Sequence, residues 1–523
     1  MNEFNLFADF LKCVLQSIGN VESEEDLQKT KFELKQIYKK IEAFGKEEAF
    51  YEFIKNEYGD DEEIYAMLLQ YIYEVTKISG ALERYLEMKL EEQFLTDKDL
   101  FLELNLREQM VNLLFRRGKV LPFEREWNIN ARIGESGAEK LNTVYEMIKK
   151  EDRNQDLVVI FVKVILSTAH TPTRLLLELS RIIQKKLGKK VLIISAVLKT
   201  DVSLLSQAGM TSGFVMLNHM EERGNCFIEY KGEKISVYQL MVEKENQAEI
   251  KAVWNKIYEL KPFCVWNLAA DPLWTVIAKQ FTTSIYTIMR QGYPAVDADL
   301  IVNYIPAVHP ADVKNKEFLL SRNVDVVETE FLFPYEKPCK NLQRREAGIP
   351  EDVFCLGVVG TRLLTECSDL FLEVLCRAAG KDTGIFVIFI GLSEEEEAGL
   401  EKKLKGKLER YRLTGMKDDL IEYLDLLDLF VNPPRVGGGN TGAMALSVGV
   451  PVLTLDKGDI AAVAGKEFTV ETLDDYPEMI WKYKNDSEFY QRQSRRAKEQ
   501  IEEKTTGDEE LAAIIQNVFD RIG

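Results

Sequence analysis

The sequence predicts an α/β protein in which two Rossmann-like domains face each other across a cleft and an α-helical module precedes them. Three observations predict this fold class. The first 150 residues contain a single proline, Pro122, and space their apolar residues as helices do. Two series of continuous apolar strands then alternate with helices. A length of 523 residues suits two or three domains.

Residues 1–150 are predicted to form the α-helical module. One stretch places apolar side chains at helical intervals, at Ile64, Met67, Leu68, Tyr71, Ile72 and Val75. This spacing predicts a helix with one apolar stripe. The module holds 30 acidic and 21 basic residues, so it carries nearly half of the net charge of −19. Its surface is either a set of solvated helix faces or a docking surface for an acceptor or a partner subunit.

The first Rossmann-like domain is predicted over residues 155–325. Its strands are expected over 157–166, 191–195, 263–267 and 284–289. A helix over 175–183 joins the first two strands into a βαβ unit. Two alternating segments on either side of Lys231-Gly232 predict a β-hairpin over 225–238.

The second Rossmann-like domain is predicted over residues 345–485, after a polar, proline-containing linker over 333–341. Its strands are expected over 354–359, 385–391 and 429–432 and from residue 452 onward. Helical patterns separate these strands, including an acidic-to-basic helix over 394–409. Residues 486–523 read as C-terminal helices.

The stretch over 432–455 reads as a strand end, a glycine-rich loop, a short helix and a second strand. Gly437, Gly438 and Gly439 remove side chains where the backbone must approach another group closely. The helix expected to open near Thr441 offers unpaired N–H groups and a positive dipole end. The pattern predicts a phosphate site at the carboxyl ends of a parallel sheet. The alternative is a glycine-rich turn in an ordinary doubly wound domain.

The complete motif is Asn-Pro-x-Arg-x-Gly-Gly-Gly, a helix, and then Gly-x-Pro-Val-x-Thr-Leu. It resembles the donor-binding half of GT-B glycosyltransferases, particularly the group that includes O-GlcNAc transferase and bacterial cytoplasmic protein glycosyltransferases. The resemblance covers about residues 155–475. It implies a GT-B-like pair of domains, with the acceptor side over 155–325 and the donor side over 345–485.

The resemblance also implies an activity. The chain would move a hexosyl or N-acetylhexosaminyl group from a nucleotide-diphosphate donor to a protein or glycan acceptor. UDP is the nucleotide expected in the donor. Such enzymes meet the diphosphate charge with backbone N–H groups and basic side chains, so neither a metal nor a bound cofactor is expected. A sugar-nucleotide epimerase of the same fold is less expected, because its carboxylate and histidine cluster is not evident.

The diphosphate is expected on the glycine loop and the start of the helix that follows it, at Gly437, Gly438, Gly439, Asn440 and Thr441. A helix N-terminus binds anions through its unpaired N–H groups. The hydroxyl of Thr441 can bond a phosphate oxygen, or it can simply cap the helix.

Three further residues are expected at the donor. Arg362 follows a strand end in Val-Val-Gly-Thr-Arg-Leu and matches the loop residue that similar glycosyltransferases turn toward the diphosphate. Arg435 can bind phosphate oxygens, or it can hold the loop by bonding backbone carbonyls. Gly415 lies in the loop whose backbone meets the base edge in related enzymes.

His170 is the candidate catalytic residue. It lies in Ala-His-Thr-Pro-Thr-Arg, directly after the first strand of the 155–325 domain. The stretch resembles the His-Pro-Thr loop of O-GlcNAc transferase, where the histidine lies beside the reactive centre. A histidine with a pKa near neutrality can accept a proton from the acceptor. The alternative is a histidine that hydrogen-bonds its own turn.

The chain departs from the family pattern at Met444. Many GT-B enzymes carry Glu or Asp there, and the carboxylate bonds ribose hydroxyls, which methionine cannot do. Either another group, for instance Asp459 or Glu467, holds the ribose, or donor binding is weakened or lost. The second hypothesis is therefore a degenerate, non-catalytic GT-B protein that serves as a partner- or glycan-binding subunit of a glycosylation system.

Composition excludes several other classes. The net charge of −19 argues against a nucleic-acid surface. No segment is apolar enough for a membrane span, and the N-terminus lacks a signal-peptide pattern, so a cytoplasmic protein is expected. Seven scattered cysteines and three histidines do not predict a zinc site. Asp297-Ala-Asp299 imitates a metal motif but is expected to be structural.

Overall fold

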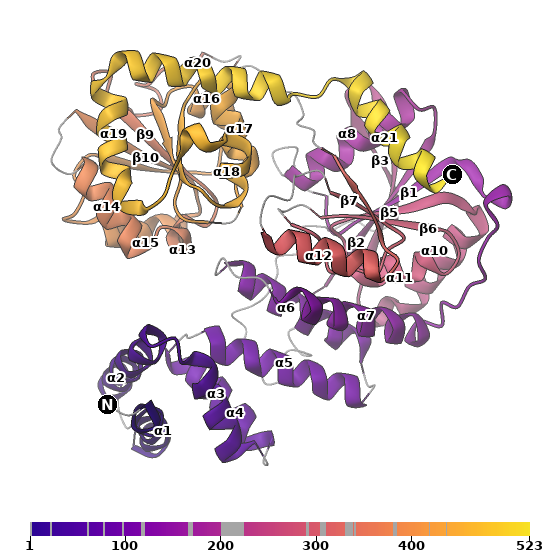
Figure 1. The fold of residues 1–523 in the computed structure, drawn as a ribbon, viewed down its shortest axis with the longest axis horizontal. Helices are drawn as coiled ribbons and strands as arrows, with labels where there is room; N and C mark the ends of the chain where they lie inside the picture. The colour runs from indigo at the N-terminus through magenta and orange to yellow at the C-terminus, as the bar shows by residue number, and fades with distance from the viewer. Residues whose placement is uncertain are drawn as a thin grey trace. The chain divides into compact units, whose positions relative to one another are not determined.

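The computed structural model describes residues 3–523 except 21–23, 60–61, 77–78, 97–98, 117–120, 166–170, 200–223, 289–291, 304–309, 330–337, 339–340, 380–383, 418 and 436 (Figure 1). The chain forms two compact units. The first holds the N-terminal helices, and the second holds two β-sheets with their covering helices. No helix in the described ranges is both long and apolar enough to cross a membrane.

The N-terminal unit is helical. Its helices are α1 (Glu3–Asn20), α2 (Glu24–Ala43), α3 (Glu47–Tyr58), α4 (Glu62–Thr76), α5 (Ser79–Thr96), α6 (Leu100–Arg116) and α7 (Phe123–Lys140). Only part of the stripe predicted on α4 faces the core. Leu68 and Ile72 are buried, whereas the exposed fractions of Ile64 and Met67 are 39% and 53%. A helical spacing therefore identified the helix without fixing the width of its buried face.

The first sheet has eight strands in the order β3-β4-β2-β1-β5-β6-β7-β8. They are β1 (Asn154–Val162), β2 (Lys190–Leu198), β3 (Gly224–Tyr230), β4 (Glu233–Val242), β5 (Pro262–Leu268), β6 (Thr283–Thr287), β7 (Leu300–Asn303) and β8 (Asp325–Glu328). The helices of this part are α8 (Thr171–Lys185), α10 (Gln247–Leu260), α11 (Pro272–Lys279) and α12 (Pro310–Ser321). Strands β1, β2 and β5 to β8 are parallel.

The predicted hairpin is confirmed. Strands β3 and β4 pair antiparallel around Lys231 and Gly232, whose φ angles are 48° and 85°. Two consecutive residues at positive φ are what a tight hairpin turn requires. The first strand ends earlier than expected. It was predicted over 157–166, whereas β1 ends at Val162, before Lys163.

The second sheet has six strands in the order β11-β10-β9-β12-β13-β14. They are β9 (Phe354–Val359), β10 (Ile385–Leu392), β11 (Tyr411–Gly415), β12 (Leu429–Val431), β13 (Val452–Leu455) and β14 (Thr469–Val470). Its helices are α13 (Leu363–Glu366), α14 (Asp369–Ala379), α15 (Glu394–Leu404), α16 (Leu420–Leu424), α17 (Gly439–Ser447), α18 (Gly458–Ala464) and α19 (Tyr476–Asn485). All its strand pairs are parallel, and the buried pattern of β9 and β10 follows from cover on both faces.

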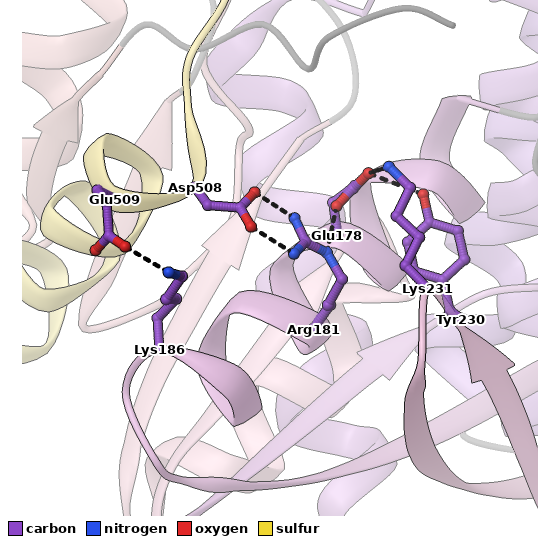
Figure 2. Close-up of polar contacts among 7 residues, drawn as sticks. All are labelled: Glu178, Arg181, Lys186, Tyr230, Lys231, Asp508 and Glu509. Atoms are coloured by element: carbon purple, nitrogen blue, oxygen red, sulfur yellow. Dashed lines mark hydrogen bonds and ion pairs between the residues drawn. The ribbon is translucent and has the colours of Figure 1, made fainter.

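The last two helices are α20 (Ser487–Lys504) and α21 (Asp508–Ile522). Helix α20 packs Ala497 and Ile501 into a core of the second sheet, whereas α21 returns to the first sheet and buries Phe519 there. Polar contacts fix the start of α21 against α8 (Figure 2). Arg181 forms two hydrogen bonds with the Asp508 carboxylate, at 2.7 and 2.5 Å.

The same cluster extends to the β3–β4 hairpin. Glu178 of α8 accepts hydrogen bonds from Arg181, from Tyr230 at 2.9 Å and from Lys231 at 2.5 Å (Figure 2). The Glu178 side chain is only 2% exposed, so its charge requires these donors. The cluster therefore ties the hairpin, α8 and α21 together.

Candidate functional site

The candidate site lies at the carboxyl edge of the second sheet, where the strand order reverses. Strands β9, β10 and β11 succeed one another in one direction, and β12, β13 and β14 succeed one another in the other. The reversal falls between β9 and β12. In open parallel sheets, ligands bind in the crevice beyond the strand ends at such a switch point. The loops after β9 and β12 carry Arg362 and the glycine-rich motif.

The glycine loop opens α17 earlier than expected. The helix begins at Gly439, two residues before Thr441, and its N-cap is Gly438 at a φ of 103°. Thr441 is therefore inside the first turn and is not the cap. Gly439, Asn440 and Thr441 occupy the first three positions of the helix.

Internal packing explains two of the glycines. A Cβ atom on Gly438 would lie 3.0 Å from Nε of Arg435, and its φ of 103° disfavours any other residue. A Cβ on Gly439 would lie 3.0 Å from the Cβ of Asp459. At Gly360, after β9, a Cβ would lie 2.5 Å from Nη1 of Arg435. Both loops are thus built around the Arg435 side chain.

Arg435 is a buried brace across the strand ends. Its Nε donates to Oδ1 of Asn432 at 2.8 Å, Nη2 donates to the Val359 carbonyl at 2.9 Å, and Nη1 donates to Oε2 of Glu366 at 2.9 Å. The side chain is 7% exposed. Of the two roles that the sequence offered, holding the loop fits these contacts, because they join the ends of β9 and β12.

Asn432 extends the brace. Its Nδ2 donates to Oγ1 of Thr454 at 3.0 Å, and its carbonyl accepts from the Tyr476 hydroxyl at 2.8 Å. These bonds link β12 to β13 and to α19. Buried polar groups almost always form hydrogen bonds within the protein. These bonds therefore cross-link the carboxyl edge of the sheet.

Arg362 is the more exposed of the two arginines. It is the N-cap of α13, and its side chain is 40% exposed. Nε and Nη2 both donate to Oε1 of Glu366, at 3.0 and 2.8 Å. Glu366 thus receives Arg362 on one oxygen and Arg435 on the other. Glu366 was not predicted as a site residue, although its place four residues after Arg362 is the spacing of a helical ion pair.

Met444 stands where the resemblance implies a ribose-binding carboxylate, and its sulfur contacts a polar side chain of the same helix. Nδ2 of Asn440 lies 3.6 Å from the sulfur of Met444, one helical turn further along α17. Of the two substitute carboxylates, Asp459 lies beside the glycine loop, next to Gly439. Glu467 instead pairs with Arg496 of α20 at 3.0 Å. Position therefore favours Asp459 over Glu467.

Gly415 ends β11, whose partner in the sheet is β10. A Cβ there would lie 3.7 Å from the Leu392 carbonyl, an ordinary contact, so packing within the protein does not demand glycine. Beyond it, Met416 is 73% exposed, and Nζ of Lys417 lies 5.1 Å from the ring centroid of Tyr423.

The remaining candidates belong to the first sheet. His170 lies outside the described residues, between β1 and α8. Its sheet reverses strand order between β1 and β5, so the loop after β1 follows a switch point. Asp297 pairs with Lys279 at 2.6 Å, and Asp299 accepts from the Ser284 backbone at 2.8 Å. These contacts give both aspartates structural partners, as the sequence suggested.

Comparison with known proteins identifies the fold. Residues 339–482 match the family described as Glycosyl transferases group 1, and no curated protein sequence matches the chain. The chain is similar to a mutant of the Thermobaculum terrenum O-GlcNAc transferase, with a TM-score of 0.56 and 12% identity over 100% of this chain and 98% of that one. It is also similar to apo OtsA, with a TM-score of 0.50 and 10% identity over 71% of this chain and 100% of that one. The chain therefore has the GT-B fold, and residues 339–482 are similar to the group 1 glycosyl transferases.

Proposed function

We propose that the chain is a metal-independent glycosyltransferase that takes its sugar from a nucleotide-diphosphate donor and passes it to a protein or glycan acceptor. The sugar is hexosyl or N-acetylhexosaminyl, and the donor is UDP-linked, as the family resemblance suggests. His170 is the proposed catalytic residue. No cofactor is part of the proposal.

One observation carries the proposal. Arg435 lies beside Gly438, the N-cap of α17, and bonds Glu366, which also holds the partly exposed guanidinium of Arg362. Backbone N–H groups at a helix start and an arginine fork are complementary to phosphate oxygens. Preorganised donors of this kind stabilise a leaving diphosphate without a metal, and each is typically worth about 3 kcal/mol in the transition state.

The cellular setting completes the proposal. The cysteines in the described ranges are free thiols, which suits a reducing, cytoplasmic compartment. The acidic α-helical module is the proposed contact for a partner subunit. The loop after Gly415 is the proposed contact for the base.

Binding and turnover of nucleotide sugars test the proposal. A panel of UDP-sugars should raise the melting temperature, and the protein should release free UDP slowly even without an acceptor. Arg362→Ala and Thr441→Ala should reduce both effects. Arg377→Ala is the matched control, because Arg377 of α14 pairs with Asp474 and takes no part in the proposed site. Absence of any thermal shift with every donor would overturn the proposal.

The second candidate is a non-catalytic GT-B subunit that binds a partner or a glycan. Met444 in place of a ribose-binding carboxylate, with its contact to Asn440, favours this alternative. Donor hydrolysis separates the two functions, because an active transferase leaks sugar to water and a binding subunit does not. Glycan binding without any UDP release would favour the second candidate.

A further inference from the structure

Glu366 joins the two arginines of the candidate site, because it accepts hydrogen bonds from Arg362 on one oxygen and from Arg435 on the other. We propose that Glu366 is a positioning residue: Arg435 fixes its carboxylate, and the carboxylate in turn holds Arg362 in place for the donor diphosphate. This inference rests on the proposed function and deepens it, because it names the group that prepares the diphosphate site.

The Arg435 side of Glu366 is rigid. The two side chains are 7% and 8% exposed, and Arg435 also bonds Asn432 and the Val359 carbonyl. Because those two partners terminate β12 and β9, the position of Oε2 is set by the sheet itself. A flexible carboxylate could not orient a second side chain, but an anchored one can.

The Arg362 side of Glu366 faces solvent. Arg362 gives two N–H groups to the single atom Oε1, which fixes the plane of its guanidinium while 40% of the side chain stays exposed. A free arginine side chain samples many rotamers, and ordering it opposes binding. Because Glu366 already orders the Arg362 side chain, less conformational entropy is lost when an anion binds.

The order of the pair argues against a role in helix stability. Arg362 is at the start of α13 and Glu366 is at its end. An ion pair in this order stabilises a helix less than the reverse order does. The stability of the four-residue α13 therefore explains little of the contact.

The two arginines differ in what an anion can reach. The Arg362 side chain is 40% exposed and the Arg435 side chain is 7% exposed, so an anion meets Arg362. A competing role is a counterion that the diphosphate must displace. The two roles predict opposite signs, because removing the Glu366 charge weakens diphosphate binding in the first and strengthens it in the second.

A double-mutant cycle on the full chain tests the inference. Isothermal titration calorimetry with UDP and with pyrophosphate is applied to wild type, Glu366→Gln, Arg362→Ala and the double variant. We expect Glu366→Gln to weaken binding about 5- to 10-fold and the double variant to bind no more weakly than Arg362→Ala alone. A merely structural role would not produce this complete coupling.

Controls keep the test interpretable. Glu503→Gln removes an exposed glutamate of α20 that pairs with Arg496, and it should leave binding unchanged. If Glu366→Gln fails to fold by circular dichroism, Glu366→Asp replaces it. That carboxylate is one methylene shorter, so it keeps its charge but cannot reach both arginines, and the same loss of affinity is expected.

The outcomes separate two failures. Equal or tighter binding by Glu366→Gln overturns the inference, as does an additive effect in the double variant. Neither result affects the proposed function, since wild type still binds the diphosphate. If wild type binds neither UDP nor pyrophosphate, the proposed function fails, and the inference fails with it.

Discussion

Nη1 of Arg435 lies 2.9 Å from Oε2 of Glu366, and the two side chains are 7% and 8% exposed. Arg435 also donates hydrogen bonds to the Val359 carbonyl and to Asn432, so it connects the ends of β9 and β12. The glycines at 360 and 438 are required where the guanidinium passes. The glycine-rich motif therefore encodes an internal brace as well as an open helix start.

The first prediction concerns the stability of this brace. Arg435→Met leaves Glu366 buried without its buried counterion, and breaking a buried ion pair from one side costs about 3–5 kcal/mol. We expect the free energy of unfolding to fall by about that amount in urea denaturation. Arg362→Met is the control, because its more exposed pair is worth at most about 1 kcal/mol. Equal losses in the two variants would contradict the assignment of Arg435 as the brace.

The sequence was most informative where strands are long and buried on both faces. Strand β9 was predicted with its observed bounds, and β10 differed by one residue, because continuous apolar runs leave little ambiguity. Strands β7, β8 and β14 were not predicted. They have four, four and two residues, too few for a period to show.

The site was predictable loop by loop but not as an assembly. Arg362 and Arg435 were each placed in the correct kind of loop after a strand. Their common partner was missed, because the contact between Arg435 and Glu366 spans 69 positions and depends on β9 and β12 being neighbours. Strand order is a property of the whole sheet, and no local pattern carries it.

The second prediction concerns Met444. Met444→Glu places a carboxylate one turn beyond Asn440, where it can accept hydrogen bonds from ribose hydroxyls. A hydrogen bond to a charged group contributes about 1.5–3 kcal/mol, so UDP affinity should rise about 10-fold or more in titration calorimetry. Pyrophosphate affinity should not rise, because it has no ribose. Met444→Gln controls for size, and weaker UDP binding by Met444→Glu would refute a ribose contact at this position.

The third prediction concerns Asp459, beside Gly439. If the Asp459 carboxylate holds the ribose, because position 444 has no carboxylate, Asp459→Asn should weaken UDP binding about 10-fold and leave pyrophosphate binding unchanged. If the carboxylate instead only repels the phosphates, the same variant should bind both ligands more tightly. Comparison of the two ligands on one variant decides between these roles. Asp456→Asn, an exposed neighbour, is the matched control.

The last prediction concerns acid and the start of α21. The hydrogen bond from Arg181 lowers the pKa of Asp508 below its ordinary value, against a smaller opposing effect of burial. Burial alone would raise the pKa of Glu178, but the hydrogen bonds from Lys231, Tyr230 and Arg181 outweigh it and lower that pKa as well. Carboxylates with depressed pKa values stabilise the fold above their unfolded pKa of about 4, and this contribution is lost as the pH falls through the folded value.

Asp508→Asn should therefore be less stable than wild type at neutral pH, by up to about 1 kcal/mol for a partly exposed pair. The difference should persist down to about pH 5 and then shrink in more acidic solution, because protonated Asp508 resembles the asparagine. Urea midpoints measured from pH 7 to pH 3 give the comparison. Glu509→Gln is the control, since Glu509 is 84% exposed beside Lys186 and should show little difference at any pH. A gap between wild type and Asp508→Asn that stays constant down to pH 3 would mean that the Arg181 contact does not carry the stability of this helix start.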